Sequence, residues 1–247
     1  MNNKKGGAAH DGVAPPDSIG IISGQYTIIV RLKKLAKSHG FITKRNSCFR
    51  IKGDGILQIL KFEYEPWLSQ YELRIGLYSL YSFLQPHWLT PSGCILRYPV
   101  MACTQMYQDV SYSPEQQLHA LQEFGFAWLD AMHTQSDLVD AMCEIEIRIH
   151  GKIQWIDSFK LAPYLSSGNY HAAERILSSI LQQHLGPDVW TTNPWTEIDY
   201  EIYRSRYPGK DEHLLLIYDW IHNKDISAIQ SYLSDNFVVN SSSNKLT

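Results

Sequence analysis

Some histidine and carboxylate residues of this chain have a spacing that resembles that of catalytic or metal-binding sites. The chain has 10 histidines, and histidine is the side chain whose charge changes most readily near neutral pH. Asp130 and His133 stand three positions apart on an expected helix and could share a proton, or hold a metal ion together with Glu123. Three polar residues on one solvated helix face give the same pattern, and we favour that interpretation.

Two further sets of residues are candidates for acid–base chemistry or metal binding. Glu144 and Glu146 would project to the same side only in a strand, where paired carboxylates can act as acid and base. Their alternation with Arg148 is more typical of an ion-paired, solvated edge. His213 and His222 are nine positions apart, about 900° of helical turn, and therefore lie on opposite faces of a helix and cannot chelate together.

The motifs of common enzyme classes are absent from the sequence. No serine stands in a Gly-x-Ser-x-Gly elbow, and no Gly-x-Gly-x-x-Gly follows an expected strand. The glycines of Gly53-Asp54-Gly55 suit a tight hairpin and not a phosphate loop, because a strand follows them instead of a helix. We therefore predict no cofactor, no metal and no catalytic residue, while an enzyme of unrecognised type stays open.

The four cysteines indicate the redox state of the chain. Cys48, Cys94, Cys103 and Cys143 lie far apart, without a CxxC pair or a histidine at zinc-finger spacing. No apolar run approaches the ~20 residues of a membrane span, and the first residues lack the apolar core of an export signal. We expect reduced, partly buried thiols, no membrane association and a cytoplasmic protein.

Aromatic residues suggest where a partner could bind. The chain has 15 Tyr and 7 Trp, and we expect most of them in the core, because aromatic side chains dominate core packing. The segment between Gly186 and Pro208 shows little helical periodicity. A partner surface is therefore predicted at these four residues: Trp190, Trp195, Tyr200 and Tyr203.

Periodicity predicts an α+β protein in which an N-terminal helix covers a small antiparallel sheet and a helical part follows. The face of Ile28, Leu32 and Leu35 predicts a helix over residues 25–39. Short β-branched or aromatic stretches predict strands over 41–44, 47–52, 56–63, 71–80 and, in a loop-rich connection, 94–97. Helices are predicted over 113–133, 158–165, 170–185, 211–222 and 225–234. Residues 138–150 fit both a helix and a strand, and their length favours the helix.

The same patterns divide the chain into four parts. We expect flexible tails at residues 1–20 and 241–247, a subdomain of helix and sheet at 21–112 and a helical subdomain at 113–240. Charge divides the chain as well: residues 1–62 hold 11 Lys/Arg and 3 Asp/Glu, a balance of +8, and residues 63–247 hold 11 and 22, a balance of −11. Because the acidic part would repel a polyanion, we favour a solvated basic face over a nucleic-acid site.

A family resemblance spans residues 25–80. It is carried by these residues: Leu32-Lys33-Lys34-Leu35, Ser38-His39-Gly40-Phe41, Lys44-Arg45-Asn46-Ser47-Cys48-Phe49-Arg50, Ile56-Leu57-Gln58-Ile59-Leu60-Lys61-Phe62 and Leu73-Arg74-Ile75-Gly76-Leu77-Tyr78. The stretch resembles the bacterial domain of unknown function 4304. Lys61-Phe62-Glu63 and Arg74 depart from the family pattern, which more often has Phe-Gln-Lys/Arg and Asn at these places.

The resemblance implies a fold and a class of function without assigning a role to any residue. Some relatives look like immunity proteins that are encoded beside toxins, and such proteins bind a toxin without a catalytic site. We therefore expect a protein-binding module, with an immunity protein of a bacterial toxin system as one role. An enzyme of unrecognised type and a nucleic-acid-associated protein that uses the basic N-terminal part are the alternatives. The oligomeric state stays open.

A first prediction concerns the basic residues Lys33, Lys34, Lys37, Lys44 and Arg45. If they form only a solvated face, reversing three of them changes the free energy of unfolding by no more than about 0.5 kcal/mol per site. Chemical denaturation measures this change. Salt-dependent retention of DNA or RNA by the wild type that is lost on reversal would contradict the solvated face.

Overall fold

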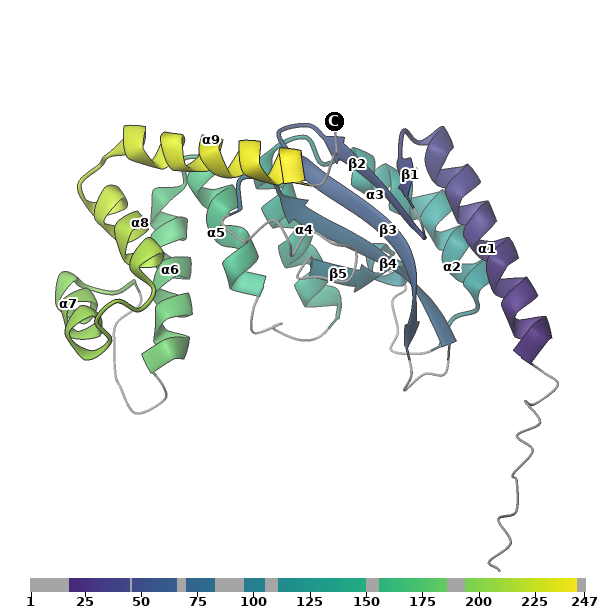
Figure 1. The fold of residues 1–247 in the computed structure, drawn as a ribbon, viewed down its shortest axis with the longest axis horizontal. Helices are drawn as coiled ribbons and strands as arrows, with labels where there is room; N and C mark the ends of the chain where they lie inside the picture. The colour runs from purple at the N-terminus through teal and green to yellow at the C-terminus, as the bar shows by residue number, and fades with distance from the viewer. Residues whose placement is uncertain are drawn as a thin grey trace, which may run out of the picture.

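The computed structural model describes residues 18–44, 46–65, 70–82, 96–104, 111–149, 156–185 and 194–243. Within these residues, five strands form an antiparallel sheet whose spatial order follows the chain (Figure 1). The strands are β1 (Ile42–Lys44), β2 (Ser47–Lys52), β3 (Ile56–Glu65), β4 (Gln70–Ser79) and β5 (Leu96–Pro99). Short connections join β1 to β4 in turn, whereas residues 80–95 separate β4 from β5.

Helices make up most of the rest of the described chain. They are α1 (Ser18–Ser38), the 3-10 helix η2 (Val100–Cys103), α2 (Pro114–Ala120), the π-helical turn η3 (Leu121–Gly125), α3 (Phe126–Asp130), α4 (Gln135–Arg148), α5 (Ile156–Ser166), α6 (Tyr170–Leu185), α7 (Glu197–Arg206), α8 (Glu212–His222) and α9 (Ile226–Ser243). The segments α2, η3 and α3 continue one another. Their first turn is fixed by the Ser113 hydroxyl, which accepts from the Gln116 backbone N–H while the Gln116 side chain accepts from that of Ser113.

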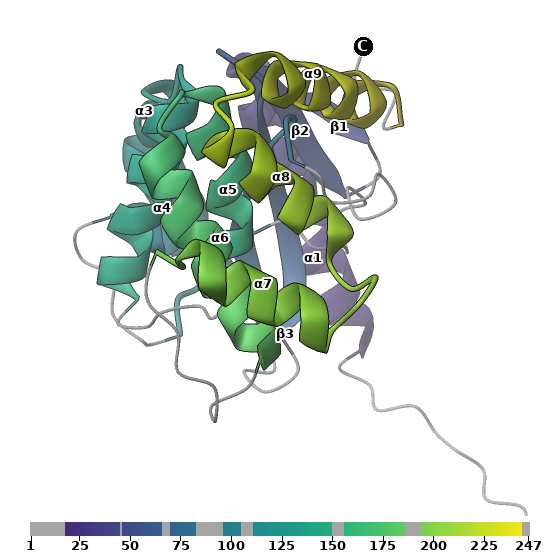
Figure 2. The same ribbon diagram turned by 90° about the vertical axis from the view of Figure 1, so that its left-hand side faces the viewer.

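The two faces of the sheet carry different neighbours. Figures 1 and 2 place α3 and α4 on one side of the sheet and α9 across one end of the other side. Contacts agree with this arrangement: Gln58 on β3 donates to the Leu129 carbonyl of α3, whereas Asn240 on α9 donates to the carbonyls of Leu80 and Ser82 just after β4. The first helix, α1, packs against β1, β2 and α2 and buries Ile28.

The β2–β3 hairpin shows why this sequence turns where it does. Gly53 and Gly55 have φ of +51° and +66°, which L side chains rarely adopt. The register pairs Lys52 with Ile56 across the turn. The tip also contacts distant parts of the chain, because the Asp54 N–H donates to the His133 carbonyl at 2.8 Å.

The buried side chains form two clusters that meet inside α5. The first joins the sheet to α1, α2, α3 and α4 and ends at Phe159, and the second runs from Leu161 through α6, α7 and α8. The last helix, α9, belongs to both, because Ile229 and Leu233 lie in the second cluster and Phe237 packs on the first. The expected subdomain boundary at residue 113 does not coincide with this division.

The α+β class, the antiparallel sheet and the helical C-terminal part are confirmed. Residues 138–148 are helical, as their length favoured, and the expected strands and helices in the described residues are present, with differences in their ends. Three predictions were wrong in detail. α1 begins at Ser18, inside the expected tail; α9 continues to Ser243; and α7 occupies a segment predicted to be a loop.

Replacement of Gly53 by alanine tests the hairpin contact. An added Cβ would lie 2.1 Å from the His133 carbonyl oxygen, so the backbone must shift. Gly40→Ala is the matched control, because Gly40 also has a positive φ and an added Cβ there meets nothing within 4 Å. We expect about 1–2 kcal/mol of destabilisation for Gly40→Ala from φ alone, and about 1–3 kcal/mol more for Gly53→Ala from overpacking. Equal losses in chemical denaturation would contradict the packing of the hairpin on His133.

Candidate functional site

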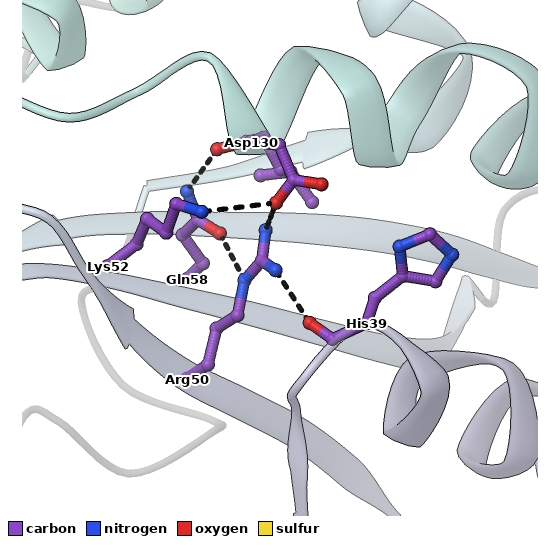
Figure 3. A network of polar contacts seen from close by, with 6 residues as sticks. His39, Arg50, Lys52, Gln58 and Asp130 are labelled. Atoms are coloured by element: carbon purple, nitrogen blue, oxygen red, sulfur yellow. Dashed lines mark hydrogen bonds and ion pairs between the residues drawn. The ribbon is translucent and has the colours of Figure 1, made fainter.

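A buried arginine joins four segments of the first core cluster (Figure 3). The Arg50 side chain of β2 donates to the Gln58 Oε1 at 2.8 Å, to the His39 carbonyl at 2.6 Å and to the Asp130 Oδ1 at 2.6 Å. Its guanidinium also lies 4.4 Å from the centre of the Phe41 ring. Each guanidinium nitrogen therefore donates to a protein oxygen, as a buried arginine requires.

The partners of Arg50 are themselves held in place. Gln58 is fully buried and donates to the Leu129 carbonyl at 2.7 Å. The His39 ring stacks on Phe126 with 3.6 Å between centroids. Because Lys52 also approaches Asp130, with its Nζ 3.6 Å from Oδ1, that carboxylate faces two cations. This geometry fixes the end of α1 and α3 on the sheet, and we assign it a structural role.

The structure separates the residues that could have formed an acid, base or metal site. Asp130 is engaged by Arg50, whereas Glu123 contacts His119, with 3.1 Å between Oε1 and Nε2. Among the residues that the structure describes, no group of three His, Cys, Asp or Glu side chains could hold a metal ion. Because α4 is a helix, Glu144 and Glu146 diverge: Glu144 pairs with Arg148, and Glu146 pairs with Lys160 at 2.6 Å.

The described cysteines are all free. Cys48 and Cys103 are buried and Cys143 is half-buried, whereas Cys94 lies outside the described residues. Burial raises the pKa of Cys48 to about 11 and that of Cys103 to about 12. These two thiols are therefore protonated at neutral pH and are not activated nucleophiles.

The aromatic side chains predicted as a partner surface lie in the second core cluster. Trp195, Tyr200 and Tyr203 are each almost fully buried. The Trp195 ring meets Tyr200 edge-on at 5.1 Å, and Tyr200 stacks on Tyr218 at 3.3 Å. For these three residues the prediction of an exposed surface was wrong, because α7 turns them toward α6 and α8. Trp190, the fourth, lies outside the described residues.

The helix that buries these tyrosines exposes isoleucines on its opposite side. Thr196 caps α7 together with Asp199, whose carboxylate accepts from the Thr196 N–H at 2.7 Å. Ile198 and Ile202, one turn apart, are 70% and 43% exposed. We call these two side chains the α7 patch.

A second exposed apolar group lies on the sheet. The register places Ile42, Phe49 and Ile59 in one row across three strands, and Ile51 follows Phe49 on the same face. Ile42 is 57% and Ile51 37% exposed, whereas Phe49 and Ile59, beside them on the same face, are buried. These four residues form the sheet patch. It faces away from α3, because the neighbouring Gln58 points toward that helix.

At Arg50 and Ile51, strand β2 departs from the usual division of polar and apolar side chains. Arg50 faces the core and Ile51 faces outward, whereas an antiparallel sheet normally buries its apolar face. Sequence reasoning missed the sheet patch for this reason, since the run from Cys48 to Ile51 shows no alternation of polarity. The Thr196-x-x-Asp199 capping pattern was the signal that could have revealed α7.

Comparisons with protein-family models, curated proteins and solved structures found no match. The resemblance to the domain of unknown function 4304 therefore stays a prediction. None of the described helices combines the length and apolar character needed to cross a membrane.

Replacement of Arg50 by methionine tests the structural role of its network. The change leaves the buried Gln58 oxygen and the His39 carbonyl without their donor, and we expect a loss of about 1–3 kcal/mol for each acceptor that stays unsatisfied. Arg31→Met is the control, because the Arg31–Glu115 pair is 3.8 Å long and exposed and should contribute less than about 1 kcal/mol. Urea denaturation measures the free energy of unfolding of both variants. Equal stability of the two variants would contradict a structural role.

Proposed function

We propose that this protein acts by binding another protein through the sheet patch. The observation that carries the proposal is strand β2, which buries Arg50 and exposes Ile51 beside the exposed Ile42. The two exposed isoleucines bury less apolar area in the monomer than core side chains do, and so contribute less to its folding. Departures from local rules of this kind concentrate at functional sites.

The sheet patch has the anatomy of an interface centre. Its exposed isoleucines lie beside the buried Phe49 and Ile59 on the same sheet face, so packed neighbours limit their movement. Rigid apolar side chains at the centre of a contact give most of the binding energy in protein interfaces. Lys44, two positions after Ile42 on the same face, is exposed and supplies a charged rim.

Inhibition of a toxin is the specific form of binding that we propose. The sheet patch lies wholly within residues 25–80, the stretch that resembles a family with immunity proteins among its apparent relatives. An immunity protein needs a stable surface that fits its toxin, and the buried network around Arg50 gives the sheet that rigidity.

The double variant Ile42→Ser/Ile51→Ser tests this function. Proteins retained by the wild type from its native host are identified, purified and titrated against both forms by calorimetry. We expect the variant to weaken binding at least tenfold, about 1.4 kcal/mol, with an unchanged thermal midpoint. Ile147→Ser/Val238→Ser is the control, because these residues are 76% and 62% exposed on α4 and α9. It should bind like the wild type.

The sheet patch and the toxin hypothesis are tested by separate outcomes. Binding that is equal for the sheet-patch variant and the control would refute the sheet patch as the interface. For the toxin hypothesis, a toxin-like reading frame beside the gene is expressed with each form. We expect the wild type and the control, but not the sheet-patch variant, to protect growth against this toxin. Failure of the wild type to protect would overturn the role as a toxin inhibitor.

A further inference from the structure

The outward face of α1 carries a row of basic side chains. Val30, Lys33, Lys34 and Lys37 are three or four positions apart and therefore lie on one face of the helix, away from the buried Leu32. Lys34 and Lys37 are exposed, and Lys33 is half-buried. The row extends over about 10 Å of the helix.

Strand β1 adds a fourth lysine beside this row. The chain turns at Gly40, which has a positive φ, and β1 then lies beside the end of α1 and packs against it (Figure 1). Lys44 of β1 is exposed and lies on the same face of the sheet as Ile42, at the rim of the sheet patch. We call the following four residues the lysine strip: Lys33, Lys34, Lys37 and Lys44.

The charge of the lysine strip is not balanced within the described part of the molecule. Arg31, the neighbouring basic residue of α1, pairs with Glu115 of α2 at 3.8 Å. None of the four lysines forms an ion pair with any described residue. Lys33 and Lys37, four positions apart, repel each other, so the row does not stabilise α1. The strip is therefore a local surplus of positive charge on a chain whose formal net charge is −3.

We propose that the lysine strip binds an acidic segment of the foreign protein that contacts the sheet patch. The assignment rests on the proposed function, because it concerns the same partner. Carboxylates on one face of a partner helix are about 5–6 Å apart, which matches the spacing of Lys33 and Lys37. Attraction between such charges acts over about 10 Å at 0.1 M salt. It therefore orients the partner before the apolar contact forms, and it raises the association rate more than it slows dissociation.

A polypeptide fits this surface better than a nucleic acid or a membrane does. Val30, 45% exposed within the row, and the exposed Ile42 offer aliphatic contacts that a phosphate backbone cannot use. Arginine is the side chain that binds phosphate bidentately, and Arg31 is already paired with Glu115, whose exposed carboxylate would repel a duplex. A surface helix binds a membrane through its apolar face, and the apolar face of α1 is buried in the first core cluster.

A fluorescent oligomer of L-glutamate tests the strip without the foreign partner. Its binding to the full chain is measured by fluorescence anisotropy at low salt. We expect Lys34→Glu/Lys37→Glu to weaken binding about tenfold with an unchanged circular dichroism spectrum, and added salt to weaken binding to the wild type. Arg175→Glu/Lys224→Glu is the control for net charge, because both residues are exposed, and α6 and the end of α8 lie far from α1 (Figure 1). This control should bind within about twofold of the wild type.

Three results would contradict the proposal. The wild type does not bind the glutamate oligomer at low salt, or the strip variant binds it as tightly as the wild type does. In the third, a DNA duplex or a phosphatidylglycerol vesicle displaces the oligomer from the strip at equal concentration of negative charge, which would assign the strip to a nucleic acid or to a membrane.

The rates of binding to the foreign protein purified from the native host separate this proposal from the proposed function. We expect Lys34→Glu/Lys37→Glu to slow association about tenfold and to leave dissociation as in the wild type, whereas Ile42→Ser/Ile51→Ser speeds dissociation. Unchanged association in the strip variant, with binding that still depends on Ile42 and Ile51, would remove the lysine strip alone. Slower association in the strip variant, with a complex that does not depend on Ile42 and Ile51, would remove the sheet patch as the interface.

Discussion

The guanidinium of Arg50 is the point on which the first core cluster depends, because it bonds to oxygens from three other segments at once. The end of α1, the middle of β3 and the end of α3 each supply one acceptor. A charge can stay this deep only if its donors are satisfied, so the positions of these segments are mutually fixed. Ile51, the next residue of β2, points to the opposite face of the sheet and is 37% exposed there.

Local signals in the sequence sufficed for most of the fold, and their limits have physical causes. Gly53 and Gly55 determine a turn by backbone preference alone, and Ser113 determines a helix start through its own hydroxyl. Helix α7 was missed because both of its faces are apolar, so no one-sided pattern exists. In the sequence, the last turns of α9 resemble a polar, flexible terminus. The hydrogen bonds from Asn240 to the distant Leu80 and Ser82 carbonyls explain why these turns are helical. The Arg50 network and the sheet patch depend on strand register, which the sequence does not display.

The two exposed patches arise in different ways. On the sheet, Ile42 lies on the edge strand β1 and Ile51 follows the inward Arg50 on β2. On α7, Tyr200 and Tyr203 fill the core below and leave Ile198 and Ile202 on the outside, so the helix has more apolar side chains than its buried face can hold. Ile42, Ile51, Ile198 and Ile202 stay exposed in the monomer, whereas Phe49 and Ile59 of the sheet patch belong to the first core cluster.

The path of α9 affects the order in which the molecule can be completed. Asn240 reaches back across 160 positions of sequence to the Leu80 carbonyl, and Phe237 lies against the Tyr81 ring, 5.2 Å between centroids. A ribosome releases the chain from its N-terminus, so the sheet can form while α9 has not yet been made. During synthesis the end of β4 therefore lacks this cover. The last contacts join residues 160 positions apart, and contacts of such long range form slowly in folding.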